Sequence, residues 1–174
     1  MSRRGRTLTG VILLLLCFTA AGQAQVPLRD SLRVFVTDAA GSAHVVVLGH
    51  HDEASDDFDI ALGESPVPPV PFDLVFDARF VDRPGVPRVP ETGAYRDIRK
   101  HGEARIDTFL IRVQPVNNAW PMELRWREDE TPQFMQLLLR PRDSEGAFID
   151  MQSQSRFVLA HDTKQPILIL VRRH

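Results

Sequence analysis

The chain has 174 residues, of which 43% are hydrophobic and 25% are charged. This composition is typical of a folded globular protein and excludes a disordered or fibrous chain. The 21 basic and 23 acidic residues give a net charge of −2, which argues against a surface that binds nucleic acid as a whole.

Residues 1–24 have the pattern of a signal peptide. Three arginines within the first six residues form a basic segment, and residues 11–21 form an apolar run. Residues 22–24 are Gly-Gln-Ala, which supplies the small residues of a signal-peptidase site. The apolar run is shorter than the ~20 residues of a permanent membrane span. We therefore expect a protein that begins at Gln25 and is exported, either to the periplasm or to the cell surface and exterior.

The expected mature part, residues 25–174, carries 18 basic and 23 acidic residues, a net charge of −5. It contains no cysteine, because the one cysteine of the chain is Cys17. A domain of about 150 residues buries about 68–70% of the surface of its unfolded chain, which is enough for stability without disulfides. We expect one domain over residues 25–174, without a membrane span and without a nucleic-acid partner.

Short stretches of alternating apolar and polar residues follow one another along this mature part. This period of two predicts β-strands, and no stretch keeps a helical period. The predicted strands cover residues 32–36, 43–48, 74–80, 95–99, 106–114, 122–127, 134–140, 147–151, 156–160 and 167–172. Because no helices intervene to connect parallel strands, the pattern predicts an all-β fold, an antiparallel two-sheet β-sandwich.

Three further features refine this prediction. Residues 106–113 and 167–171 are hydrophobic on both faces, which favours central positions in a sheet. Residues 66–71 read Pro-Val-Pro-Pro-Val-Pro and predict an extended connector, because proline cannot donate to a strand ladder. Trp126 alternates in phase with Met122 and Leu124, so we expect it in the core.

An acidic segment stands out between Arg33 and Arg79, where the chain has nine acidic residues and no lysine or arginine. Six of the nine lie in residues 52–64, where their mutual repulsion requires compensation. One interpretation is a Ca²⁺ site, because this cation prefers several carboxylate and carbonyl oxygens on a loop. Its expected ligands are Asp52, Asp56, Asp57, Asp59 and Glu64. The alternative is a solvated acidic loop that pairs in part with arginines of the next segment. The spacing does not match an EF-hand loop.

The sequence contains no motif of an enzyme. His50 and His51 are adjacent, so an extended backbone directs them to opposite sides, away from one shared zinc ion. There is no HExxH, no GxSxG and no Gly-rich phosphate loop. Trp120, at a turn before Pro121, is a candidate platform for stacking on a sugar ring.

Several segments, taken in chain order, resemble a secreted bacterial β-sandwich module with an immunoglobulin-like or jelly-roll-like fold. They are residues 32–38, 45–49, 54–59, 63–64, 68–71 and 76–80, then Asp97-Ile98-Arg99, Leu124-Arg125-Trp126 and Ile149-Asp150-Met151. Such modules occur in surface and extracellular proteins, often before the sorting domain of the type IX secretion system. Asp57 stands where the family has a glycine, and the sequence ends at His174 without a sorting domain. The resemblance implies a non-catalytic extracellular module related to proteins of type IX secretion, but it does not imply type IX export for this chain.

These observations favour an exported, non-catalytic β-sandwich with a structural or adhesive role toward a cell-surface protein or polysaccharide. Ca²⁺ at the acidic loop is its expected stabilising ion. A carbohydrate-binding module that uses Trp120 is the alternative, and a small secreted hydrolase that uses acidic side chains is a third hypothesis.

Overall fold

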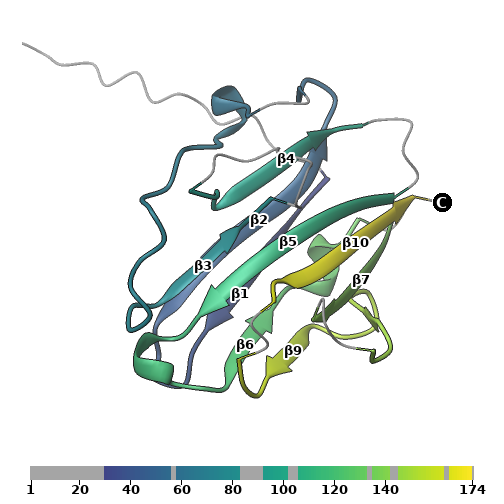
Figure 1. The fold of residues 1–174 in the computed structure, drawn as a ribbon. Helices are drawn as coiled ribbons and strands as arrows, with labels where there is room; N and C mark the ends of the chain where they lie inside the picture. Colours follow the sequence, from purple (N-terminus) through teal and green to yellow (C-terminus); the bar gives the residue numbers. More distant parts are fainter. Residues whose placement is uncertain are drawn as a thin grey trace, which may run out of the picture.

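The fold is all-β, as the sequence predicts. The computed structural model describes residues 30–55, 58–82, 92–101, 106–132, 135–141, 145–162 and 165–173. These residues form ten strands in two sheets of five, which makes a β-sandwich (Figure 1). Each predicted strand is present, with ends that differ by a few residues. The expected signal peptide, residues 1–24, lies outside the described residues.

The first sheet has the strand order β4-β2-β1-β6-β9. Its strands are β1 (Asp30–Thr37), β2 (Ala43–His51), β4 (Arg96–Lys100), β6 (Met122–Arg125) and β9 (Arg156–Leu159). Along β1, the buried residues Leu32, Val34 and Val36 alternate with the exposed residues Arg33 and Phe35. The period of two therefore directs one face of the sheet into the sandwich and the other toward solvent.

The second sheet has the order β3-β5-β10-β7-β8. Its strands are β3 (Asp77–Phe80), β5 (Ile106–Gln114), β7 (Met135–Pro141), β8 (Ile149–Asp150) and β10 (Ile167–Arg173). The two strands that are hydrophobic on both faces, β5 and β10, lie side by side in its interior, as predicted (Figure 1). Three short 3₁₀ turns, η1 (Ile60–Leu62), η2 (Val116–Asn118) and η3 (Glu128–Glu130), connect strands. No helix in the described part of the chain is long and apolar enough to cross a membrane.

One strand pair differs from the antiparallel expectation, since β4 runs parallel to β2. Just before β4, Ala94 bridges Phe80 on the edge of the second sheet. The chain then joins the first sheet at Arg96, so residues 94–96 pass from one sheet to the other. Gly93 has a φ of 86°, and a Cβ at this position would lie 2.5 Å from the carbonyl oxygen of Phe80. The crossing therefore requires glycine at this position.

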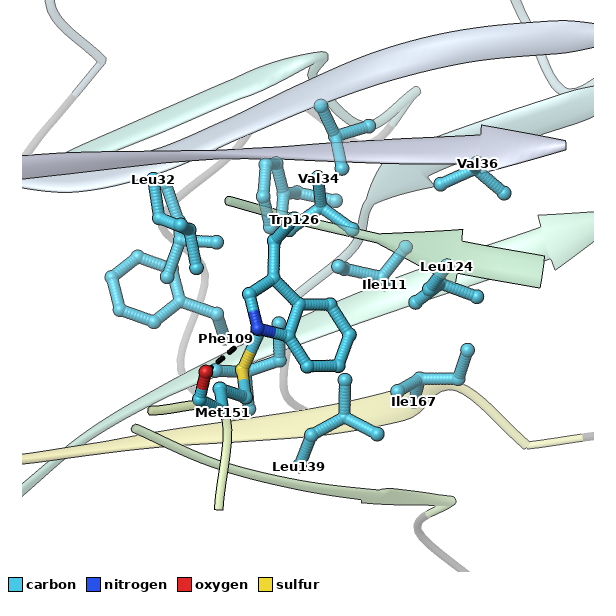
Figure 2. Packing of buried hydrophobic residues seen from close by; sticks show 14 of the residues in the cluster. Leu32, Val34, Val36, Phe109, Ile111, Leu124, Trp126, Leu139, Met151 and Ile167 are labelled. Atoms are coloured by element: carbon cyan, nitrogen blue, oxygen red, sulfur yellow. Dashed lines mark hydrogen bonds between the residues drawn. The ribbon is translucent and has the colours of Figure 1, made fainter. Parts of the chain in front are cut away.

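The core lies between the inner faces of the two sheets, where 21 buried hydrophobic residues of the described part of the chain form one continuous cluster. Trp126 is 3% exposed, as its alternation with Met122 and Leu124 predicts. Its indole Nε1–H donates to the carbonyl oxygen of Met151 at 2.7 Å, the dashed line in Figure 2. The ring is thus buried without an unsatisfied polar atom.

The Pro-rich connector is fixed by one buried arginine on β3. Arg79 is 2% exposed, and its Nε and Nη2 donate to the two carboxylate oxygens of Asp77 at 2.7 and 2.8 Å. Its Nη1 donates to the carbonyl oxygens of Pro68 and Thr92, at 2.6 and 2.5 Å. Both carbonyls belong to segments that lie along the edge of the second sheet, so Arg79 holds the connector against β3.

The third predicted strand is wrong over residues 74–76. The structure places Leu74 and Val75 in a bend, where they are 57% and 48% exposed, and β3 begins only at Asp77. The cause is Gln114, whose Nε2 donates to the carbonyl oxygens of Phe72 and Val75 at 2.8 and 2.7 Å. These two bonds use carbonyls that a strand would offer to a neighbouring strand.

Candidate ligand pocket

A pocket of about 570 Å³ lies beside the C-terminal end of β5. Its lining combines one tryptophan with several side chains that form hydrogen bonds, and with a few aliphatic residues. The lining residues are Asp73, Val81, Arg112, Val113, Gln114, Pro115, Asn118, Trp120, Leu159, Asp162, Gln165 and Pro166. They come from segments far apart in the sequence, which the sandwich brings together at this end (Figure 1).

The loop that carries Trp120 is held by the carboxylate of Asp38. The Asp38 Oδ1 accepts from the backbone N–H groups of Ala40 and Ser42, while Oδ2 accepts from that of Val116 at 2.9 Å. Asn117 and Asn118 then have φ angles of 47° and 56°, a left-handed conformation that asparagine adopts more readily than most residues. This turn brings Trp120 half-buried against the core, at the wall of the pocket.

Gln114 connects the pocket to residues 72–75. Its amide nitrogen donates to two carbonyls of that segment, and the N–H of Asn117 donates to the carbonyl of Leu74 at 3.1 Å. These bonds fix the bend that carries Asp73. Phe72 is 89% exposed beside it. The rim of the pocket is therefore an ordered part of the fold, held from β5 and η2.

Several polar groups of the pocket have no partner in the part of the chain that the structure describes. None of the described residues forms an ion pair or hydrogen bond with the side chains of Asp73, Arg112 or Asn118. Nor does any described residue accept a hydrogen bond from the indole of Trp120. The pocket thus presents a cation, an anion, an amide and an aromatic ring for contact with a ligand, and polar groups that converge in this way can fix a ligand's orientation.

The acidic loop is only partly described, because Asp56 and Asp57 lie outside the described residues. Asp52 has a 91% exposed side chain. The carboxylate of Asp59 accepts from the N–H and the Oγ–H of Ser55, at 2.7 and 3.0 Å, and so closes a small turn within the loop. Among the described residues, no group of three His, Cys, Asp or Glu side chains is arranged to hold a metal ion. The Ca²⁺ site proposed for this loop stays a prediction.

Glu64, the fifth expected ligand, is directed into the protein and is 4% exposed. Its Oε1 accepts from the N–H of Ile98 on β4 at 2.6 Å, and its Oε2 accepts from the N–H of Asp59 at 2.5 Å. Burial raises the pKa of this carboxyl to about 7, although the two backbone hydrogen bonds oppose the shift. Glu64 therefore fastens the acidic loop to the edge of the first sheet.

The opposite end of β5 carries a group of charged side chains between the two sheets, here named the His50 cluster. Its members are Asp30, His50, Asp97, Arg99, His101 and Asp107. Nε2 of His50 lies 2.8 Å from Oδ2 of Asp107, and Nε2 of His101 lies 3.2 Å from Oδ2 of Asp30. Arg99 forms two bonds with Asp97 and stacks 3.9 Å from the ring centroid of Phe109. These groups satisfy one another, so the cluster is a link between the sheets.

The adjacent histidines have separate partners, as an extended backbone predicts. His50 is 2% exposed and contacts Asp107, whereas the half-buried His51 accepts at Nδ1 from the N–H of Glu53 at 3.1 Å. Two buried ion pairs of the Asp-x-Arg type were not predicted, namely Asp77 with Arg79 and Asp97 with Arg99. The signal was present, because residues i and i+2 of a strand share one face.

The chain matches no protein-family model, no curated protein and no solved structure.

Proposed function

We propose that this protein is an exported, non-catalytic β-sandwich module that binds carbohydrate in the pocket beside Trp120. Adhesion to a cell-surface polysaccharide is the role that this binding serves. The observation that carries the proposal is the composition of the pocket, in which an aromatic ring lies beside Asp73, Arg112 and Asn118, whose side chains have no partner among the described residues.

Sugar recognition requires both kinds of group. The face of a pyranose ring presents C–H groups that pack on an indole, and its hydroxyls need donors and acceptors when water leaves. Trp120 supplies the ring, while Asn118 and Asp73 supply a donor and an acceptor. A pocket of about 570 Å³ is also within the range of volumes that hold small ligands.

The experiment is a glycan array probed with the wild-type protein and with Trp120→Ala. We expect binding that falls at least tenfold in Trp120→Ala, because stacking is lost. Phe35→Ala is the matched control, since it removes an exposed aromatic ring from the outer face of the first sheet. Glycan binding that survives in Trp120→Ala would refute the pocket as the binding site.

The hydrolase hypothesis is tested on the same ligand. Asp73 and Asp162 both line the pocket, so two carboxylates lie near any sugar bound there. No serine, cysteine or histidine is among the described residues that line it. The proposal predicts that a bound oligosaccharide is recovered uncleaved after prolonged incubation, and a shortened product would establish an enzyme instead.

A further inference from the structure

Arg112 indicates the chemical class of the ligand more narrowly than the other residues of the pocket do. It lies on β5 directly opposite Arg79 of β3 in the strand register. Asp77 neutralises Arg79 through two hydrogen bonds, whereas no described residue pairs with the guanidinium of Arg112, a residue that is half-buried as a whole. Arg112 is therefore a cation of the pocket lining that no described residue pairs with, although the carboxylates of Asp73 and Asp162 line the same pocket.

A ligand that fills the pocket removes water from this guanidinium. The desolvation of an unpaired charge is costly unless the ligand replaces the lost hydrogen bonds. A hydroxyl replaces only one of them, while a carboxylate accepts two parallel N–H bonds from the planar fork of an arginine. The most favourable ligand thus brings a carboxylate to Arg112.

The other polar groups of the pocket require hydroxyls on the same ligand. Asp73 has no side-chain partner among the residues that the structure describes and, as a carboxylate, only accepts hydrogen bonds. Sugar hydroxyls donate to Asp73, so that the ligand's own carboxylate does not have to lie against it. A molecule with one carboxylate and several hydroxyls on a ring satisfies both demands.

We propose that the ligand is an acidic sugar, of the uronic or sialic acid class, whose carboxylate pairs with Arg112 while its hydroxyls bind Asp73 and Asn118. This inference rests on the proposed carbohydrate-binding function and names its ligand class. Arg112 is then the residue that determines specificity, and Trp120 supplies affinity for sugar rings in general.

The test compares oligosaccharides that contain uronic or sialic acids with their methyl esters and with neutral glycans, on one array and by titration calorimetry. Methyl esters keep the ring and its hydroxyls but remove the negative charge. We expect the acids to bind at least tenfold more tightly than the esters, and more weakly as salt is raised. In Arg112→Gln, the acid should lose at least tenfold in affinity and bind no better than its ester.

Two variants control for charge and shape. Arg172→Gln removes the same charge from the same sheet at the other end of β10, and should bind like the wild type. Arg112→Lys keeps the charge but not the planar fork, and should recover only part of the loss. Trp120→Ala should weaken acids and esters by a similar factor.

The outcomes separate this inference from the proposed function. Neutral glycans or esters bound as tightly as acids, with no effect of Arg112→Gln, overturn the acidic-sugar inference and leave carbohydrate binding in place. No binding of the wild-type protein to any acidic or neutral glycan overturns both.

Discussion

His50 and Asp107 join the two sheets, because Nε2 of His50 on β2 lies 2.8 Å from Oδ2 of Asp107 on β5. A carboxylate only accepts hydrogen bonds, so Nε2 of His50 is the donor. The His50 side chain is 1% exposed and that of Asp107 is 18% exposed, so little water reaches the pair. The contact therefore fixes the end of the sandwich that lies about 17 Å along β5 from Arg112, the first residue of this strand in the candidate pocket.

Asp107→Ala should consequently destabilise the fold. The substitution leaves a buried imidazole N–H without its acceptor, and we expect a loss of about 2–4 kcal/mol in the free energy of unfolding. Urea denaturation followed by circular dichroism measures it. The comparison is Arg33→Ala, which breaks an ion pair with Glu130 whose arginine is 55% exposed, and which should have a much smaller effect. Equal stability of Asp107→Ala and wild type would contradict the structural role of this pair.

Glu64 should make stability depend on pH. Its pKa rises from an ordinary 4.5 to about 7 in the folded protein, so the folded state holds this proton more tightly than the unfolded state. The contribution of this shift to the free energy of unfolding is present in full below pH 4.5 and is lost as the pH rises through 7. The total loss is about 3 kcal/mol.

The measurement is the free energy of unfolding of wild type and Glu64→Gln at pH 4.5 to 8. Glutamine cannot ionise, so the part of the pH dependence of stability that is due to Glu64 disappears. It also sets an amide N–H₂ against the backbone N–H of Asp59 or Ile98, which lowers stability at every pH. The difference between the two proteins should therefore vary with pH. A difference that stays constant over this range would show that Glu64 does not titrate there.

The Ca²⁺ expectation for the acidic loop is tested by thermal unfolding in EDTA and in millimolar Ca²⁺. An ion that binds only the folded state at 100 times its dissociation constant adds about 2.7 kcal/mol, which raises the melting temperature by several degrees. The double variant Asp56→Ala with Asp59→Ala should abolish the shift, although loss of the bonds from Ser55 to Asp59 also lowers the starting stability. Glu53→Ala, an acid of the same loop outside the proposed ligand set, should keep it. If Ca²⁺ does not raise the melting temperature of the wild-type protein, the alternative of a solvated acidic loop holds.

The sequence predicts the fold well where the information is local. Two-sided hydrophobicity places β5 and β10 inside a sheet, and the alternation around Trp126 places that ring in the core. The failures involve partners distant in the chain. Leu74 alternates like a strand residue, yet the amide of Gln114, 40 positions later, holds its segment in a bend. The parallel pairing of β4 likewise depends on the bridge at Ala94.

The pocket was less accessible to prediction than the sheets. Trp120 was recognisable as a candidate from its place at a turn, but Arg112 looks like an ordinary polar residue of a central strand. Its proposed role rests on the commitment of Asp77 to Arg79, which leaves Arg112 unpaired among the described residues. Such a residual charge appears only once every partner has been assigned in three dimensions.

The most direct test of the ligand pocket uses the two tryptophans of the chain as paired reporters. In a ¹⁵N-labelled protein they give two indole N–H resonances, one from Trp120 at the pocket wall and one from Trp126, which is bonded to Met151 in the core. Titration with an oligosaccharide selected on the array should shift the Trp120 resonance and leave that of Trp126 in place. A saturated complex in which the Trp120 resonance has not moved would contradict binding in this pocket.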